Sequence, residues 1–386
     1  MVRCDECWEK RFNTLQAWSA DRAQSQCGGR IYLVGGAVRD QLLGRPVTER
    51  DWVVVGSTPE QMHRAGFRLA DPDFPVFLHP VTGEEYALAR RETSTVGGYR
   101  GFALDISPQI TIEEDLARRD LTINAMAQDE TGQCIDPYQG RQDLAARRLR
   151  HVTPAFVEDP VRVLRTARFA AGLGHLGFDV VPETLQLMRQ VMISDHKLMP
   201  ARIRYEMQKA LACAQPWHFF ALLVQAGMRP VADIPESVQA QALAALRRVC
   251  VQTLDPDIRF VAYALPCPQL DRLHRVLMRR TARLLAQARK SWSQLAMLSS
   301  PPSPVAVWTF LQCLRAWHAN GPYAAVMQVL QAQQRYERLL TRIQVAQMAA
   351  AQVRPDLLRA QGLQGAMLGQ ALRARRQAAM TAAWYG

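Results

Sequence analysis

The chain has 386 residues, of which 48% are hydrophobic and 21% are charged, and its formal net charge is +12. This composition is typical of a globular protein, and the length predicts two or three domains. No run of about 18 apolar residues occurs, which excludes a conventional membrane-spanning helix. The first residues, MVRCDECWEK, carry charges where a secretory signal needs its apolar centre, so we expect a cytoplasmic location.

The eight cysteines are spread along the whole chain. Because no secretory signal is expected, they do not predict a disulfide framework. Cys4 and Cys7 form a lone C-x-x-C pair, with Cys27 loosely nearby. Zinc requires about four ligands, so we interpret this pair as structural or incidental.

Basic residues exceed acidic residues only in the C-terminal part of the chain. Residues 241–386 contain 19 Lys and Arg against 5 Asp and Glu, a balance of +14, whereas the first 240 residues have a balance of −2. All but one of the 19 are arginine, which binds phosphate oxygens in pairs and stacks on flat rings. This surface would suit a polyanion such as RNA, although a solvated helical surface rich in arginine has the same composition.

The N-terminal part alternates between strand and helix patterns. After a polar extension (1–30), the apolar run Ile31–Val34 predicts a strand that ends at two glycines. Asp51 opens a second strand, DWVVV, and Thr58 is a suitable N-cap for the helix that follows. Further strands are predicted in VFLHP and EEYALAR. This alternation, to about residue 140, predicts an α/β or α+β head.

From about residue 155 onward, strand patterns give way to segments rich in Ala, Leu, Gln and Arg, which favour helices. The segment 299–305, SSPPSPV, predicts a break between helices. We therefore predict an α+β fold, in which a head with a small mixed β-sheet precedes an all-helical remainder.

Two carboxylates stand at the start of the second strand. Side chains at positions i and i+2 of an extended segment point to one side, so Glu49 and Asp51 can lie on one face. Such a pair can hold two magnesium ions about 4 Å apart, the arrangement used for in-line phosphoryl transfer. Taken alone, an ordinary charged turn before a strand is the simpler interpretation.

A third carboxylate and a Gly-Gly turn accompany this pair. Alternation along EEYALAR puts Glu85 on one face with two alanines, which leaves space around its carboxylate; a solvated edge charge is the alternative. Gly35 and Gly36 would let the backbone approach a phosphate, and Arg39 follows on the next helix. A plain strand–helix turn has the same pattern.

Arginines recur in two later segments. In EEDLARRDLTINA, Arg118 and Arg119 could clamp a triphosphate, while Asp120 and Asn124 are suited to bracing the loop. The segment 158–171 predicts a helix with its proline in the first turn.

On this helix, four charged residues are spaced by three and cover one broad polar face, while apolar residues between them can pack inward. They are Asp159, Arg162, Arg165 and Arg168. Three arginines with few acids nearby favour an anionic ligand over a merely solvated face.

Six motifs follow one another in a fixed order. They are YLVGGAVRDQLLG, the acid-x-Asp before WVVV, EEYALAR, EEDLARRDLTINA, IDPYQGRQDL and LRHVTPAFVEDPVRVLRTARFAA. This series resembles the bacterial class II tRNA nucleotidyltransferases, or CCA-adding enzymes, whose superfamily includes bacterial poly(A) polymerases. The resemblance covers about residues 30–235 and is faint afterwards, with a return near 361–376.

The resemblance implies a domain organisation. Residues 31–150 would be the nucleotidyltransferase head, and 151–235 a helical neck that recognises the nucleotide base. Residues 236–386 would be a basic helical body and tail that binds tRNA. Some relatives carry a metal-binding HD phosphohydrolase domain in that half. No adjacent His-Asp pair follows residue 235 here, so we expect its metal ligands to be missing.

The resemblance also implies the activity and its site residues. The enzyme would add C, C and A to the tRNA 3′ end from CTP and ATP, with Mg²⁺, and release pyrophosphate. Glu49 and Asp51 would hold magnesium, and Glu85 would be the third catalytic carboxylate. The residues implied for the incoming nucleotide are Gly36, Arg39, Arg119, Asp159, Arg162, Arg165 and Arg168.

Among these, Asp159 and Arg162 match the family's protein template for choosing the base. A carboxylate can accept from the exocyclic amine of cytosine or adenine, and an arginine can donate to their ring acceptors. Uracil and guanine present the wrong pattern at those edges.

Two departures from the family pattern stand out. Glu49 occupies a position where the family usually has aspartate, and its extra methylene could shift the metal. The neck motif usually has Glu-Arg where this chain has Ala201-Arg202, which affects a supporting contact.

Other functions are compatible with the same residues. A poly(A) polymerase or a partial CC- or A-adding enzyme is one alternative, and a tRNA-binding protein whose catalysis is weakened by Glu49 is another. A dinucleotide-binding oxidoreductase is disfavoured because the two glycines lack the G-x-G-x-x-G spacing. We expect no membrane contact and no obligate protein partner.

Overall fold

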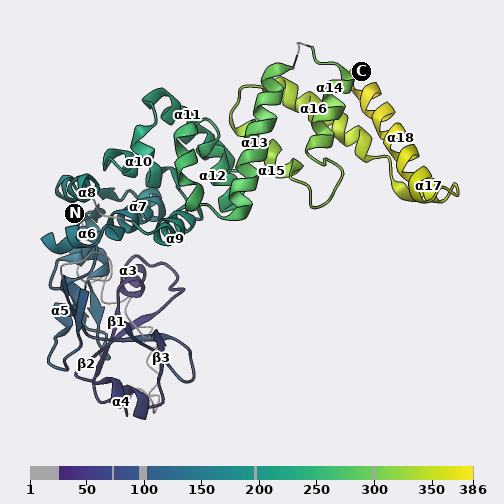
Figure 1. Cartoon of the computed structure of the whole chain (residues 1–386). Coiled ribbons are helices and arrows are strands. Elements are labelled where there is room, and N and C mark those ends of the chain that lie inside the picture. The colour runs from purple at the N-terminus through teal and green to yellow at the C-terminus, as the bar shows by residue number, and fades with distance from the viewer. Residues whose placement is uncertain (1–25, 72–73, 95–101, 195–197, 299–300, 386) are drawn as a thin grey trace. The chain divides into compact units, whose positions relative to one another are not determined.

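The computed structural model describes residues 26–71, 74–94, 102–194, 198–298 and 301–385 (Figure 1). Cys4 and Cys7, with most of the predicted extension, lie outside the described residues. The chain divides into two compact units. The first ends at Glu206 and also includes Leu222–Met228, and the second consists of Met207–Ala221 and the chain from Arg229 on. Within the described ranges, no helix is long and apolar enough to cross a membrane.

The first unit begins with a mixed sheet, as the sequence predicts. Its strands lie in the order β3-β4-β5-β2-β1-β8-β9. Strands β2 and β5 are parallel, and the other neighbouring pairs are antiparallel. The strands are β1 (Arg30–Val34), β2 (Asp51–Val55), β3 (Arg68–Asp71), β4 (Phe74–Leu78), β5 (Glu85–Leu88), β8 (Ala127–Gln128) and β9 (Cys134–Ile135).

Side-chain alternation gives this sheet two buried faces. Val53 of β2 packs on one face in a cluster with Ile112 and Leu116 of helix α5 (Ile112–Ala117). Trp52 and Tyr86 lie on the other face, where their rings stack with centroids 5.6 Å apart. Both aromatic residues are buried, so the middle of the sheet is covered on both sides.

Short capped helices connect the strands. Thr58 caps α4 (Pro59–Arg64), where its side chain accepts from the backbone N–H of Gln61 and the Gln61 side chain accepts from the N–H of Thr58. This capping box confirms the N-cap predicted for this helix. Thr111 caps α5 in the same way, and α3 (Gly36–Leu42) follows directly on Gly35.

The remaining elements of the first unit are small strand pairs and helices. The pairs are β6 (Arg91–Ser94) with β7 (Phe102–Asp105), and β10 (Arg148–Leu149) with β11 (Asp179–Val180). The helices are α6 (Gly140–Ala145), α7 (Val161–Leu173) and α8 (Pro182–Ile193), and α9 (Pro200–Leu211) and α10 (Trp217–Gln225) each contribute residues to both units. Pro160 immediately precedes α7, consistent with the predicted place for a proline at a helix start.

The second unit consists of helices, which confirms the predicted α+β fold class. They are α11 (Glu236–Cys250), α12 (Pro256–Ala264), α13 (Arg279–Met297), α14 (Pro304–Cys313), α15 (Tyr323–Ala332), α16 (Glu337–Ala351), α17 (Pro355–Arg359) and α18 (Gly365–Tyr385). The break predicted at 299–305 falls between α13 and α14, although residues 299–300 lie outside the described residues.

One buried arginine organises the start of this unit. Arg259 of α12 is 2% exposed. Its guanidinium donates to the carbonyl oxygens of Thr253, at 2.8 Å, and Leu211, at 2.7 Å. A buried cation needs such partners, so Arg259 holds the end of α9 against α12.

Candidate functional site

Three strand ends meet at one edge of the sheet. Val34, the last residue of β1, is the register partner of Asp51, the first residue of β2. Asp51 is in turn the register partner of Glu85, the first residue of β5. Because neighbouring strands lie about 4.8 Å apart, the backbones that carry these two carboxylates are adjacent.

The two carboxylates leave the same face of the sheet. Parallel register partners point to the same side, and both Asp51 and Glu85 are exposed, whereas Val53 behind Asp51 is buried and Ala87 behind Glu85 is half-buried. The burial pattern of β5 also alternates as predicted, with Glu85 exposed and Tyr86 buried. The acidic pair therefore lies where the core of this face ends and solvent begins.

Glu49 is placed differently from the expectation. It was predicted to share a strand face with Asp51, but β2 begins at Asp51 and Glu49 lies in the irregular segment before it. The physical reason is that β1 ends at Val34, where Gly35 turns the chain away, so β1 does not continue the pairing to Glu49. Its side chain is exposed, and strand geometry does not fix its direction.

Gly35 has a backbone that requires glycine. Its φ of +69° and ψ of −128° lie in a region that is essentially closed to other residues. A Cβ built on it would also lie 2.9 Å from Nη1 of Arg119. Gly36, the glycine singled out from the sequence, begins α3 and has neither constraint. The turn at this edge therefore depends on Gly35.

Arg119 lies against this turn and is held by a buried acid. Its Nη2 donates to Asp115, at 3.2 Å, and its Nη1 reaches the carbonyl oxygen of Asn124, at 3.5 Å. Its Nε is buried with no hydrogen-bond partner in the described part of the chain. Burial would raise the pKa of Asp115, but the guanidinium groups of Arg118 and Arg119 outweigh it and lower that pKa. The carboxylate is therefore charged at neutral pH.

A chain of polar contacts links Arg39 on α3 to Arg165 on α7. Arg39 Nη1 donates to Asn124 Oδ1 at 2.7 Å, and Asn124 Nδ2 donates to Asp120 Oδ1 at 3.1 Å. Asp120 Oδ2 then accepts from Arg165 Nε at 2.6 Å. Burial acts to raise the pKa of Asp120, but Arg165 and the hydrogen bonds lower it to about 2. Asp120 and Asn124 thus brace the loop, as the sequence predicts.

Arg168 has a separate acidic partner. Its Nε donates to Glu206 Oε2 at 2.6 Å, and Glu206 is 3% exposed. Sequence reasoning missed Glu206, which is 38 residues away and has no local signal. It also missed Asp115, although a carboxylate three and four residues before Arg118 and Arg119 on a helix is a recognisable pairing signal.

The two residues predicted to choose the base occupy the start of α7. Asp159 Oδ1 accepts from the backbone N–H of Val161 at 2.9 Å. Arg162 does not lie on the exposed polar face expected for it, since it is 6% exposed. The reason is that its Nη1 and Nη2 donate to the carbonyl oxygens of Ala155 and Arg118, at 2.7 and 2.8 Å. Arg165 and Arg168 do retain partial exposure.

The carboxylate oxygens at the sheet edge suit a hard divalent cation. Magnesium prefers oxygen ligands and is commonly held by one or two carboxylates, with water and phosphate completing its coordination. Asp51 and Glu85 supply such oxygens side by side. The described residues contain no cluster of three or more His, Cys, Asp or Glu side chains close enough to hold a metal.

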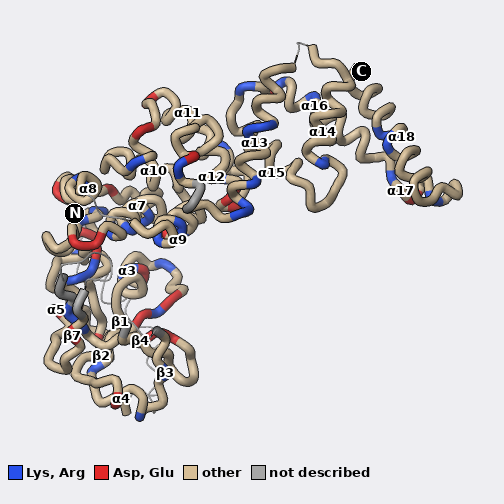
Figure 2. Tube along the Cα trace, in the orientation of Figure 1, with Lys and Arg blue, Asp and Glu red and all other residues tan. Residues whose placement is uncertain are grey.

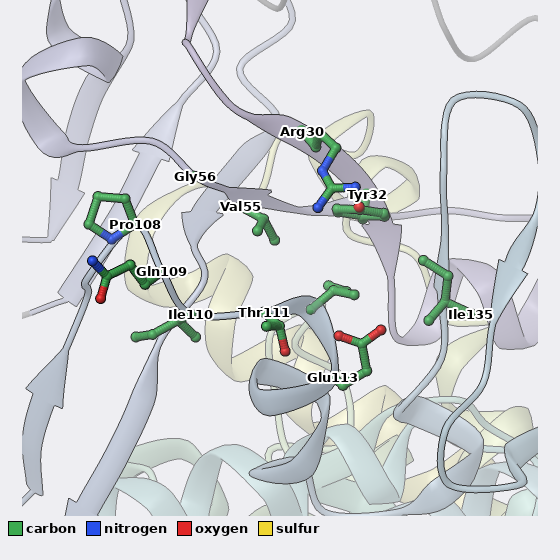
Figure 3. Close-up of a pocket in the computed structure, with 11 residues that line it drawn as sticks. Arg30, Tyr32, Val55, Gly56, Pro108, Gln109, Ile110, Thr111, Glu113 and Ile135 are labelled. Carbon is green, nitrogen blue, oxygen red and sulfur yellow. The ribbon is translucent and has the colours of Figure 1, made fainter.

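A cavity of about 370 Å³ lies elsewhere in the head (Figure 3). Arg30 and Val55 line it, and they are register partners at the end of β1 and β2 opposite to Val34 and Asp51. Figure 3 shows Arg30 and Glu113 on opposite sides of this cavity. None of the predicted site residues lines it, so we place the candidate site at the strand ends and not in this cavity.

Two protein-family models match the chain. The Poly A polymerase head domain matches residues 31–150, and a probable RNA and SrmB-binding site of polymerase A matches residues 177–231. The first range coincides with the head predicted from the sequence, and the second covers much of the predicted neck.

Curated relatives extend this match. The chain is 59% identical over 200 residues to the "Multifunctional CCA protein" of Thioalkalivibrio sulfidiphilus, which covers 51% of this chain and 49% of the relative. It is 53% identical over 234 residues to the "CCA-adding enzyme" of Pseudomonas putida, covering 60% of this chain and 63% of the relative. The chain thus spans about half to three fifths of the length of these relatives.

Solved structures share the fold over nearly the whole chain. A "tRNA-processing enzyme (apo form I)" has a TM-score of 0.68 at 22% identity and covers 99% of both chains. A "tRNA nucleotidyltransferase complexed with a primer tRNA and an incoming ATP analog" has a TM-score of 0.61 at 23% identity, covering 82% of this chain and 95% of that chain. The head-domain match and the curated relatives therefore show a Poly A polymerase head domain at residues 31–150, and the solved structures share the fold of nearly the whole chain.

Proposed function

We propose that this chain adds C, C and A to the 3′ end of tRNA from CTP and ATP, without a nucleic-acid template, and releases pyrophosphate. The observation that carries the proposal is the pairing of Asp51 with Glu85 at the sheet edge where Gly35 turns into α3. The names of the relatives, and a similar structure described as a "tRNA-processing enzyme with CTP", support the choice of substrates. Because tRNA maturation and its nucleotides are cytoplasmic, we propose that location too.

Asp51 and Glu85 would hold magnesium, and Glu49 would join them if its segment moved toward the pair. A bound pair of magnesium ions would lower the pKa of the attacking 3′-hydroxyl and neutralise charge on the leaving oxygens. The protein's part is to keep its carboxylates adjacent. Strand pairing does this for Asp51 and Glu85 without any contribution from a loop.

The triphosphate would be bound by the turn and the arginines around it. The tight backbone of Gly35 leaves room for a phosphate to approach, and Arg119 beside it has a buried Nε that lacks a partner in the described part of the chain. A planar guanidinium binds phosphate oxygens in pairs. Arg39, Arg165 and Arg168 would add positive charge. Catalysis would then rest on positioning of the substrate and on positive groups that are in place before the reaction and stabilise its developing negative charge.

Base choice would fall to Asp159 and Arg162 at the start of α7. A carboxylate and a guanidinium supply the acceptor and donor that cytosine and adenine share and that uracil and guanine do not match. The two carbonyl contacts of Arg162 fix where its guanidinium lies, which would limit the base edges that it can contact.

The tRNA would be bound partly by the second unit. Figure 2 shows Lys and Arg recurring along its helices, with fewer acidic residues among them. On α13, Arg279, Arg283 and Lys290 are exposed, while Leu284 and Ala288 are buried. At 100° per residue the three basic residues form one stripe, opposite the buried side of the helix. Such a stripe suits a run of phosphates.

The test is incubation of the full chain with tRNA that lacks CCA, magnesium and labelled nucleotides, added singly and together. CTP alone should add two residues, and CTP with ATP should complete the sequence. Long tracts of A would instead indicate a poly(A) polymerase, and addition of C only or A only would indicate a partial enzyme. No incorporation, with tRNA binding retained, would indicate a protein that binds tRNA without catalysis.

A further inference from the structure

Phe169 of α7 lies beside three arginines of the candidate site. The distance from the centroid of its ring to the central guanidinium carbon is 4.3 Å for Arg168, 5.3 Å for Arg39 and 5.8 Å for Arg165. All three distances fall within the roughly 6 Å at which a cation is attracted by an aromatic ring. Phe169 itself is 8% exposed, so its ring is fixed by packing.

The three arginines come from two separate segments of the first unit. Arg39 is on α3, whereas Arg165 and Arg168 are on α7. Each has its own polar partner elsewhere in the first unit: Asn124 for Arg39, Asp120 for Arg165 and Glu206 for Arg168. The ring of Phe169 is a neighbour that all three share.

The terminal nitrogens of two of these arginines remain available. Arg165 and Arg168 each use Nε for a carboxylate, and within the described residues their Nη1 and Nη2 groups make no hydrogen bond. An arginine held at Nε still presents the N–H groups of both Nη atoms. Such a pair of groups matches two oxygens of a phosphate. The arrangement therefore has positive donors in place before any ligand arrives.

Like charges held this close repel one another, so something must compensate. Asp120 and Glu206 neutralise Arg165 and Arg168, and Asp40 pairs with Arg39 at 3.0 Å. The negative face of an aromatic ring adds attraction for each cation without adding an acceptor that would compete with phosphate for hydrogen bonds. An aliphatic side chain of similar size would fill the space but supply no such attraction.

We propose that Phe169 is a positioning residue, whose ring holds Arg39, Arg165 and Arg168 together as one preformed binding cluster for the triphosphate of the incoming nucleotide. This inference rests on the proposed function only for the class of ligand. Phe169 acts through the arginines and touches neither the base nor the sugar.

The experiment measures binding of inorganic tripolyphosphate, ATP and CTP to the full chain by calorimetry, in the absence of tRNA. Phe169→Leu removes the ring and keeps an apolar residue, Phe169→Tyr keeps the ring, and Phe178→Leu makes the same change at a buried phenylalanine of the same unit that is 3% exposed. We expect Phe169→Leu to weaken all three ligands equally, by about tenfold. Phe169→Tyr should bind within about twofold of the unmodified chain, as should Phe178→Leu.

Unchanged tripolyphosphate binding by Phe169→Leu would overturn the inference. An equal loss in Phe178→Leu would also overturn it, because the effect would then be one of general packing. Failure of the unmodified chain to bind tripolyphosphate at all would overturn it as well. Thermal unfolding of each variant identifies any that fails to fold, and Phe169→Met, which fills more of the ring's volume, then replaces Phe169→Leu. If binding depends on Phe169 but the chain incorporates no nucleotide, the proposed function is wrong and the inference about Phe169 stands.

Discussion

Asp51 and Glu85 are register partners on the parallel strands β2 and β5, and their side chains leave one face of the sheet at the same edge. The next residue on that face is Val53 on β2, which is buried, and Ala87 on β5, which is half-buried. The two acids are therefore fixed by strand pairing and by the core beneath them. A site carried on paired strands holds its geometry more closely than one carried on a loop, which Glu49 illustrates by lying outside the strand.

The first prediction concerns Glu49. We expect Glu49→Asp to keep or raise activity, because charge is retained and one fewer rotatable bond has to be fixed, a gain on the order of 0.5 kcal/mol. Glu49→Ala should lower activity by orders of magnitude. The measurement is steady-state incorporation of CMP into tRNA lacking CCA. If Glu49→Ala has near-normal rates while Asp51→Ala is inactive, Glu49 is not a metal ligand and the metal is held by Asp51 and Glu85.

Arg162→Ala should damage the choice of nucleotide more than it damages metal dependence. It should also cost stability, because two carbonyl oxygens lose their donors, at about 1–3 kcal/mol for each acceptor left unsatisfied. The measurement compares incorporation of CTP and ATP with that of UTP and GTP, alongside urea unfolding. Arg165→Ala, three residues along the same helix, is the control and should weaken all four nucleotides alike. If Arg162→Ala is active and discriminates normally, its assignment to base choice is wrong.

The basic stripe on α13 should contribute to tRNA binding. Replacing Arg279, Arg283 and Lys290 with glutamine removes three charges from the exposed side of the helix. We expect weaker binding, and a slope of log affinity against log salt that is shallower by about 2 to 3.

The matched control for the stripe replaces three exposed arginines of the first unit with glutamine. They are Arg64, Arg68 and Arg141. The two triple variants lose the same net charge. A difference between their tRNA affinities or salt slopes therefore reflects the position of the charges and not the net charge alone. Equal salt slopes in both variants would contradict a dedicated role for α13.

Acid should weaken the fold through Asp120. Its pKa is lowered from 3.8 to about 2 in the folded chain, so the stabilisation is present above the unfolded pKa and is lost as pH falls from about 4 to about 2. The effect is about 2 kcal/mol of unfolding free energy. Urea unfolding between pH 5 and pH 2 should show a steeper loss for the unmodified chain than for Asp120→Asn. Parallel pH profiles would show that Asp120 is not the group responsible.

Local patterns in the sequence were enough to predict several elements of the head. The apolar runs predicted β1 and β2, with Asp51 at the start of the second, and the Thr58 cap predicted the start of α4. These features depend on neighbouring residues, which a single sequence displays directly. The resemblance added the expected activity and the roles of the site residues, because six ordered motifs carry far more information than any one of them.

Contacts between distant segments could not be predicted in the same way. The Asp51–Glu85 register joins residues 34 positions apart, and Arg39 meets Asn124 across 85 positions. No local pattern encodes such pairings. The burial of Arg162 was missed because helical spacing alone cannot show which face meets a neighbouring carbonyl.

The most direct test of the account is to sequence the 3′ ends of tRNA lacking CCA after incubation with the full chain, CTP, ATP and magnesium, beside the Asp51→Ala variant. We predict that the unmodified chain adds C, C and A in that order and that Asp51→Ala adds nothing while still folded and still binding tRNA. Equal addition by both proteins would contradict the placement of the site at the β2–β5 edge. No addition by the unmodified chain to correctly folded tRNA would contradict the proposed function itself.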